Sequence, residues 1–227
     1  MRHHKKELPT RRRTAARWGL LLAILVCLTS VFRLYIFLPS QARYLAEEAS
    51  NTGPTDLVCR KWYTERDGEK RLVSISHKGD TVLLSGASFH LLTGWRPDFD
   101  YAYDCHGTAL SGSVTLEGTG FLAKGFLRVG DPNVETVAVS IWAPGERQEK
   151  TEERTGVELM ELTTAHDTWV TAGNYRYVLL AADVEEAIDT KGALYGPIYL
   201  HATAYDSSGA VTAEYDSYEE QEAYWPW

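Results

Sequence analysis

Two patterns of apolar positions divide the chain. From Trp18 to Leu38 nearly every residue is apolar, and Arg33 is the single charge. From Leu57 onward, apolar and polar residues alternate with a period of two, which is typical of half-buried β-strands. The chain is therefore predicted to join one N-terminal apolar helix to a larger region of short strands.

The alternating region predicts a mainly β fold. Turn residues separate many of the strands, as in the segments 66–68, 78–80, 130–133 and 206–209. Many short strands at spacings near ten residues favour an antiparallel β-sandwich. Two short helices are expected besides, at 40–49 and from Asp183 to Gly192. The predicted strands are 57–63, 71–77, 81–85, 99–105, 113–116, 121–129, 134–142, 157–162, 175–181, 198–205 and 211–215.

The C-terminal half resembles the immunoglobulin-like sandwich modules of bacterial surface proteins. The resemblance is carried by the strand opening Gly173-Asn174-Tyr175, by the strand from Ile198 to Tyr205, and by the hairpin at 206–213, which turns on Asp206-Ser207-Ser208-Gly209. This half departs from antibody domains because it has no Cys…Trp…Cys framework. The resemblance implies an immunoglobulin-like architecture with a binding or spacer role.

The apolar stretch has the length of a membrane span. Its 21 residues would reach ~31 Å as a helix, about one hydrocarbon core. Residues 1–17 carry seven Lys or Arg against one acid, which places the N-terminus in the cytoplasm. Trp18 and Tyr35 suit the two membrane interfaces. Arg33 would either extend to the interface or pair with an acid of a partner helix.

Three alternatives to an uncleaved anchor remain open. A signal peptide could be cleaved after Ser40-Gln41-Ala42, although the apolar run is long for one. Cys27 could accept a lipid, but Val26 stands where that motif has a small residue. Residues 10–13 resemble a twin-arginine signal only in part. We expect a single-pass protein of a bacterial cell membrane, with its C-terminal region extracytoplasmic.

Charge separates the two sides of the predicted membrane. After Leu38 the chain carries 30 Asp or Glu against 15 Lys or Arg, a net charge of −15. Such a surface excludes nucleic acid as a partner and suits cations or a basic partner. The predicted organisation is a basic arm (1–17), a transmembrane helix (18–38), a juxtamembrane helix and linker (39–56), a β-sandwich (57–217, or two units divided near 118–120) and an acidic, aromatic tail (218–227).

One strand carries a row of carboxylates. Period two places Asp98, Asp100 and Asp104 on one face of the segment 98–105. Such a row could hold Ca²⁺, which prefers oxygen ligands. Alternate side chains on a straight strand stand ~6.6 Å apart, so one ion would need a bend or a further ligand. An amphipathic strand without metal is the simpler interpretation, and no cofactor is expected.

Two cysteines lie beyond the apolar stretch, at Cys59 and Cys105. An extracytoplasmic location permits a disulfide between them. Two separate buried thiols are the alternative. The sequence does not decide between the two.

Exposed aromatic residues provide the candidate binding surface. In the strand 198–205, one face is apolar and the other presents Tyr199, His201 and Tyr205. This stripe could bind a glycan or a peptide, or it could pack under another element. The tail adds three further aromatic candidates, Tyr224, Trp225 and Trp227.

No catalytic motif is present in the sequence. The chain lacks a G-x-S-x-G elbow, a phosphate-binding glycine loop, an H-E-x-x-H pair and a C-x-x-C pair. The expected function is a non-catalytic binding or assembly module held at the membrane, with an unknown protein, peptide or glycan partner. The alternatives are a subunit of a membrane complex that engages through its helix and, less favoured, an envelope hydrolase.

Overall fold

The computed structural model describes residues 10–31, 36–64, 68, 70–116, 122–144, 156–165, 168–191 and 198–217. The fold is mainly β with antiparallel sheets, as predicted. The elements are α1 (Thr10–Val31), α2 (Pro39–Ala49), β1 (Asp56–Thr64), β2 (Lys70–Lys78), β3 (Thr81–His90), β4 (Gly94–Asp104), β5 (Leu110–Leu116), β6 (Leu122–Val129), β7 (Val134–Pro144), β8 (Gly156–Ala165), β9 (Val170–Ala172), β10 (Tyr175–Asp183), α3 (Glu185–Lys191), β11 (Tyr199–Asp206) and β12 (Val211–Asp216).

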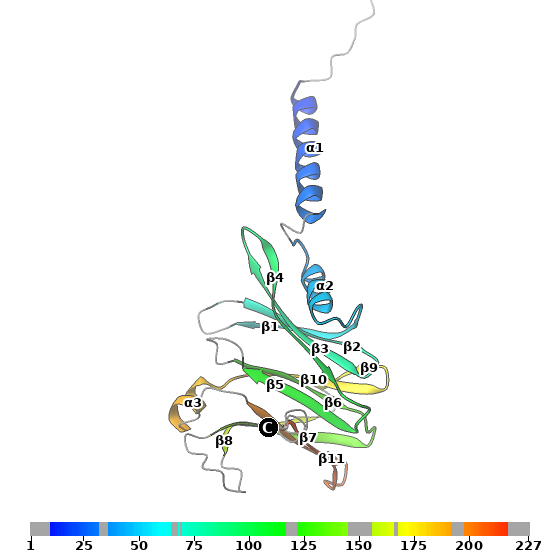
Figure 1. Cartoon of the computed structure of the whole chain (residues 1–227), viewed down its shortest axis with the longest axis vertical. Helices are drawn as coiled ribbons and strands as arrows, with labels where there is room; N and C mark the ends of the chain where they lie inside the picture. Colours follow the sequence, from blue (N-terminus) through cyan, green and yellow to red (C-terminus); the bar gives the residue numbers. More distant parts are fainter. Residues whose placement is uncertain are drawn as a thin grey trace, which may run out of the picture.

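The strands form three four-stranded sheets. Sheet A has the order β1-β2-β3-β4, sheet B the order β5-β6-β10-β9, and sheet C the order β12-β11-β7-β8. Figure 1 shows the sheets stacked as layers, with sheet B in the middle. The chain changes from sheet A to sheet B between β4 and β5. The alternative boundary near 118–120 falls outside the described residues, between β5 and β6, which pair with each other.

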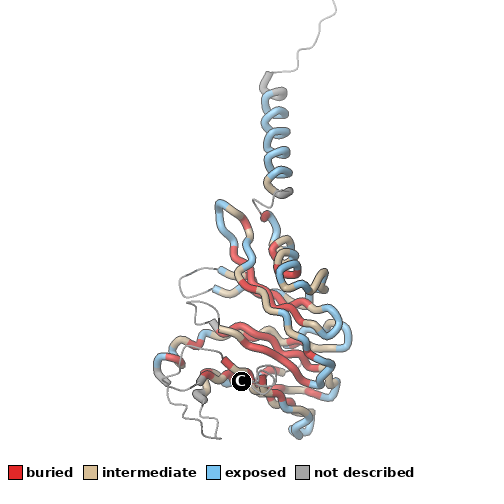
Figure 2. The backbone as a smooth tube through the Cα atoms, in the orientation of Figure 1, coloured by how far each residue is buried: buried red, intermediate tan, exposed pale blue. Residues whose placement is uncertain are grey.

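Two separate cores lie between the three sheets. The core between sheets B and C is largely aliphatic, with Leu127 of β6 and Leu200 of β11 fully buried. The core between sheets A and B is rich in aromatic rings, including Phe126 of β6 and Tyr177 of β10. Sheet B therefore contributes to both cores, and Figure 2 shows that much of this middle layer is buried.

Helix α2 covers the outer face of sheet A. Its small residues Ala42 and Ala46 are buried there in a cluster with Ala87. The helix begins at Pro39, and the Gln41 side chain accepts hydrogen bonds from the backbone N–H groups of Phe37 and Leu38 at 3.0 and 3.1 Å. Ser50, which follows the helix, donates to Asp100 at 2.6 Å. The predicted juxtamembrane helix is thus part of the folded body.

Helix α1 differs from the predicted span of 18–38. It begins at Thr10, and its described part ends at Val31. Ile36 forms a β-bridge with Gly94 instead of continuing a helix, because its backbone bonds to Thr93 and Trp95 at 3.1 and 2.8 Å. Within the described ranges, no helix has the length and apolar content needed to cross a membrane.

The hairpin of β3 and β4 is longer than predicted. The predicted strands stop at residue 85 and resume at 99, whereas β3 continues to His90 and β4 starts at Gly94. The pairing register shifts between Gly86 and Ala87. This β-bulge interrupts the period-two pattern, which explains why the sequence did not reveal the outer half of the hairpin.

Candidate binding face on sheet C

Strand β11 separates a core face from an outer face as the sequence predicts. Leu200, Ala202 and Ala204 are buried in the core between sheets B and C. The alternate residues Tyr199, His201, Thr203 and Tyr205 are half-buried and point to the other side of sheet C. In the described residues, the predicted tyrosine–histidine stripe is thus on the outside of the three-sheet stack.

The neighbouring strands extend this stripe into a wider surface. In the pairing register, Trp142 of β7 lies beside Tyr199, and Ser140 lies beside His201. The Trp142 indole N–H donates to the Ser140 hydroxyl at 2.9 Å, which fixes the ring on the sheet. We call the surface made by Trp142, Tyr199, His201 and Tyr205 the aromatic row.

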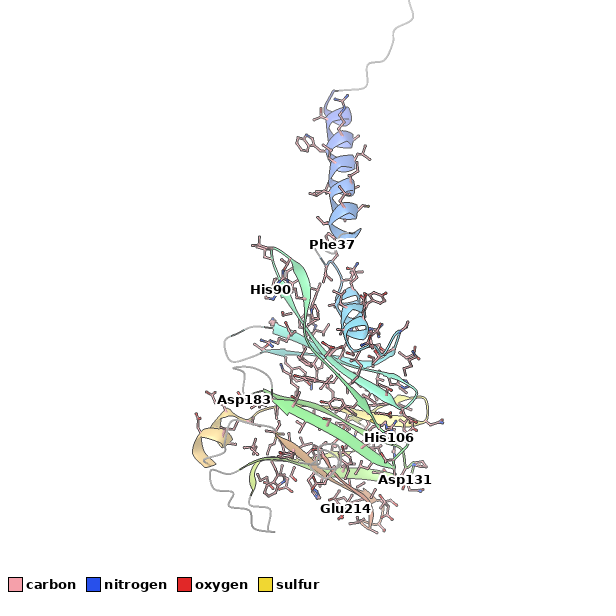
Figure 3. The ribbon with its side chains drawn as sticks, in the orientation of Figure 1. Phe37, His90, His106, Asp131, Asp183 and Glu214 are labelled. Carbon is pink, nitrogen blue, oxygen red and sulfur yellow. The ribbon has the colours of Figure 1, made fainter. Side chains whose placement is uncertain are left out.

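Carboxylates lie along both sides of the aromatic row. Asp216 of β12 lies 3.7 Å from His201 Nδ1. Glu214 also comes from β12, and Glu158 and Glu161 come from β8 on the opposite side. The four strands of sheet C contain no Lys or Arg. Figure 3 places Glu214 at the end of the molecule opposite Phe37, which follows α1.

This arrangement suits a ligand that carries positive charge. Aromatic rings attract cations through the negative faces of their π-systems, and carboxylates form charge-assisted hydrogen bonds with Lys, Arg or amino groups. The four described strands of sheet C contribute carboxylates to this face and no Lys or Arg.

The three candidate calcium ligands do not converge. Asp98 accepts a hydrogen bond from Ser88 at 2.7 Å, Asp100 accepts one from Ser50 at 2.6 Å, and Asp104 lies 3.6 Å from His106 Nδ1. Asp98 also sits at the bulge, where Phe99 and Pro97 pair with consecutive residues of β3. Among the described residues, no group of three or more His, Cys, Asp or Glu is arranged to hold a metal ion.

The candidate cysteine pair is not bonded in this structure. Cys59 and Cys105 are both free thiols, and each packs at the core between sheets A and B. Cys59 lies on β1, whereas Cys105 follows β4 at the other edge of sheet A. Three strand spacings alone separate these edges by ~14 Å, and a disulfide needs Cα atoms within about 7 Å. Burial raises the pKa of the Cys59 thiol.

The remaining candidates are only partly placed. Trp18 is exposed on α1. Arg33, Tyr35 and the tail residues Tyr224, Trp225 and Trp227 lie outside the described residues.

Sequence reasoning missed a buried cationic contact between sheets A and B. Arg128 of β6 is fully buried and donates to the Cys105 carbonyl at 2.7 Å, to Ser111 at 3.1 Å and to Asp80 at 3.0 Å. Its guanidinium carbon lies 4.2 Å from the centre of the Tyr175 ring. The sequence predicted only a strand at 121–129, and nothing local in it indicates that its polar face is covered.

The comparisons with known proteins assign no family. No family model, curated protein or solved structure matches this chain. The aromatic row, its carboxylates and the strand order are therefore the basis for any functional conclusion.

Proposed function

We propose that this protein is a non-catalytic binding or assembly module, held at the extracytoplasmic side of a cell membrane by its N-terminal helix. The observation that carries this proposal is the outer face of sheet C. It combines the aromatic row with flanking carboxylates, and its strands contain no Lys or Arg. Its partner is a basic peptide or protein segment.

The strand order supports an immunoglobulin-like sandwich for sheets B and C. In the immunoglobulin convention, successive strands are named strand A, B, C, C′, D, E, F and G, and these strand letters are independent of the sheet names used above. When β5 to β12 are named in this way, the middle sheet (β5-β6-β10-β9) has the strand order A-B-E-D, and the outer sheet (β12-β11-β7-β8) has the strand order G-F-C-C′. These are the neighbours expected in an immunoglobulin-like Greek key. Sheet A is an additional layer on the outer side of sheet B and is itself covered by α2. Among the described residues, no further sheet lies on the outer face of sheet C.

The surroundings of α1 support membrane anchoring. Large apolar side chains from Trp18 to Leu28 are exposed around the helix. A helix that is apolar on all sides needs an apolar environment, such as a bilayer or a partner helix. The basic residues at 1–17 favour a cytoplasmic N-terminus. In the same arrangement, sheet C, which carries the aromatic row, lies at the end of the folded body away from α1 (Figure 1).

A peptide-display experiment tests the binding proposal. Full-length protein in lipid nanodiscs would be screened against a random peptide library, beside Tyr199→Ala and the matched control Tyr44→Ala. Tyr44 is an exposed tyrosine on α2, on the other side of the stack. We expect Lys- and Arg-rich peptides to be enriched by wild type and by Tyr44→Ala, and to be lost with Tyr199→Ala.

The outcomes separate the candidate partners. Binding that weakens strongly as salt is raised would support a charged peptide, because exposed ion pairs are screened by salt. Equal enrichment of neutral sequences, or equal behaviour of the two variants, would refute the basic-peptide proposal. Binding of wild type to a glycan array that is lost in Tyr199→Ala would instead assign the face to glycans.

A further inference from the structure

The tip of the β3–β4 hairpin exposes an unusual amount of apolar surface. Leu91 and Leu92 occupy the turn and are 83% and 88% exposed. Phe89, at the end of β3, is about half exposed. Hairpin turns usually carry polar residues, glycine or proline, because they face water. Two adjacent leucines at this position indicate that the turn meets an apolar phase.

Aromatic rings support the base of the tip. The Trp95 ring lies 5.7 Å from Phe89 and 5.3 Å from Trp62, measured between ring centres. Trp62 itself is about half exposed and lies on β1, the opposite edge strand of sheet A. Tryptophan is enriched at the level of lipid headgroups, because its ring is apolar and its N–H is polar. The tip thus has leucines at its end and tryptophans behind them.

The tip is attached to the chain that follows α1. Ile36 donates its backbone N–H to the Thr93 carbonyl at 3.1 Å, and its own carbonyl accepts the Trp95 N–H at 2.8 Å. Figure 1 shows the hairpin rising beside the end of α1. In Figure 3, Phe37 and His90 are labelled at this same end of the molecule. The apolar tip and the apolar helix therefore point toward the same side.

Basic residues lie at the same end of sheet A as the tip. Among the described residues, β1 contributes Lys61, β2 contributes Lys70 and Arg71, and β4 contributes Arg96, although Arg71 lies 3.9 Å from Asp98. The pairing register brings these strands together at the outer end of sheet A. Basic residues behind an apolar tip match the anionic headgroups of a membrane surface.

We propose that Leu91 and Leu92 insert into the bilayer interface next to α1, as a second point of membrane contact. This inference rests on the proposed anchoring by α1. One helix alone would leave the folded body free to tilt, because it is a single attachment. A second contact through the hairpin would hold the three sheets upright and keep the aromatic row of sheet C away from the lipid.

A fluorescent label at the tip tests the insertion. Leu92→Cys and the control Val211→Cys would each be introduced into full-length protein carrying Cys27→Ser and labelled with the environment-sensitive dye NBD. Val211 is also an exposed apolar residue, at 54%, but it lies on β12 of sheet C. The Cys27→Ser parent, labelled in the same way, corrects for reaction at Cys59, because Cys105 is buried.

In vesicles of phosphatidylcholine and phosphatidylglycerol, we expect NBD at position 92 to emit several-fold more strongly, and at shorter wavelength, than NBD at position 211. Brominated lipids should quench position 92 selectively. Equal, water-like emission at the two positions would overturn the inference. So would a strong signal at 92 that brominated lipids do not quench, since this would place a protein partner or a second copy on the tip.

Flotation of the same vesicles separates this inference from the anchoring on which it rests. Protein that floats with lipid while position 92 remains water-like would retain the anchor and overturn the insertion. Protein that does not float would overturn both.

Discussion

The two faces of sheet B are covered by different chemistry, although they share the same strands. Toward sheet C, strand β6 presents Ala123, Leu127 and Val129 to an aliphatic core. Toward sheet A, the intervening residues Lys124, Phe126 and Arg128 are equally buried. The first face resembles the interior of one folded unit. The second resembles an interface, in which oriented polar contacts select one arrangement of sheet A on the sandwich.

Lys124 and Arg128 show how the polar face is made compatible with burial. The Lys124 ammonium lies 4.8 Å from the centre of the Phe99 ring, and Arg128 directs its N–H groups to three separate oxygen acceptors. A buried charge is costly unless it is paired and hydrogen-bonded. The interface between sheets A and B therefore depends on a few specific contacts, whereas the aliphatic core between sheets B and C does not. We expect the interface between sheets A and B to open before the aliphatic core does.

The largest loss of folding stability should come from a substitution on the aliphatic face of β6, which packs toward sheet C. Leu127→Ala would leave a cavity in a site where the side chain is 0% exposed. We expect a loss of about 4 kcal/mol in the free energy of unfolding, measured by urea denaturation. Hydrogen exchange should accelerate in both sheets B and C, because their shared core is weakened. Acceleration limited to sheet A would contradict the assignment of this core as the centre of the sandwich.

Substitution of Arg128, the residue after Leu127 on β6, tests the face of that strand that packs toward sheet A. Arg128→Ala would remove the hydrogen bonds to Ser111 and Cys105 and leave buried acceptors unsatisfied. We expect a loss of about 2–3 kcal/mol. Hydrogen exchange should accelerate mainly in β3, β4 and the turn at 105–108, while sheet C stays protected. An equal response in sheet C would show that the two cores unfold as one and remove the distinction between them.

The positions of the strands were largely predictable from the sequence, because alternation is a local property. The outer stripe at Tyr199, His201 and Tyr205 was predictable for the same reason: Leu200, Ala202 and Ala204 mark the buried face. The bounds of helices α2 and α3 were also predicted within a few residues. For α3 the local signal is visible in the structure, because the Asp183 carboxylate accepts the Glu185 N–H at 3.1 Å.

Contacts between sheets were not predictable in the same way. Lys124, Phe126 and Arg128 have the pattern of a solvent-exposed face, and only the arrival of sheet A makes them interior. The separation of Cys59 from Cys105 likewise depends on strand order in sheet A. The hairpin tip at Leu91 was missed because the bulge at Gly86 disrupts the alternation on which strand prediction rests.

Tyr177 provides a third, smaller test of the A–B interface. Its side chain is fully buried, and its hydroxyl lies close to the Arg128 guanidinium but makes no hydrogen bond of ordinary geometry among the described residues. Burial raises the pKa of Tyr177 to about 12, against an opposing influence of the nearby Arg128 charge. We expect Tyr177→Phe to stabilise the chain by about 1 kcal/mol at neutral pH, because an unsatisfied polar group is removed.

The alkaline behaviour of Tyr177 follows from the same shift. Since the folded pKa lies above the ordinary value of about 10, stability should be fully present below about pH 10 and fall as the pH rises toward 12. Tyr177→Phe should reduce this fall in denaturation curves taken across the range. Tyr44→Phe, at an exposed site on α2, serves as the control. An unchanged alkaline slope in Tyr177→Phe would contradict burial of the neutral phenol.

The smallest effect should come from Asp80, at the exposed end of the Arg128 contact. The hydrogen bond from Arg128 lowers the pKa of Asp80, and a further bond from the Tyr175 hydroxyl acts in the same direction. Because the folded pKa is lowered, Asp80 stabilises the chain above its ordinary pKa of about 4, and this contribution is lost as the pH falls through the folded value. Asp80→Asn should therefore flatten the acid side of the stability profile and, because it removes the Arg128 contact, slightly accelerate hydrogen exchange in β3 and β4.

Asp206→Asn is the matched control. The Ser208 hydrogen bonds lower the pKa of Asp206 in a turn of sheet C. This variant should flatten the acid side of the profile without accelerating exchange in β3 and β4. An unchanged acid profile in Asp80→Asn would mean that sheet A is held by the rings and the buried hydrogen bonds of Arg128, without help from the ion pair.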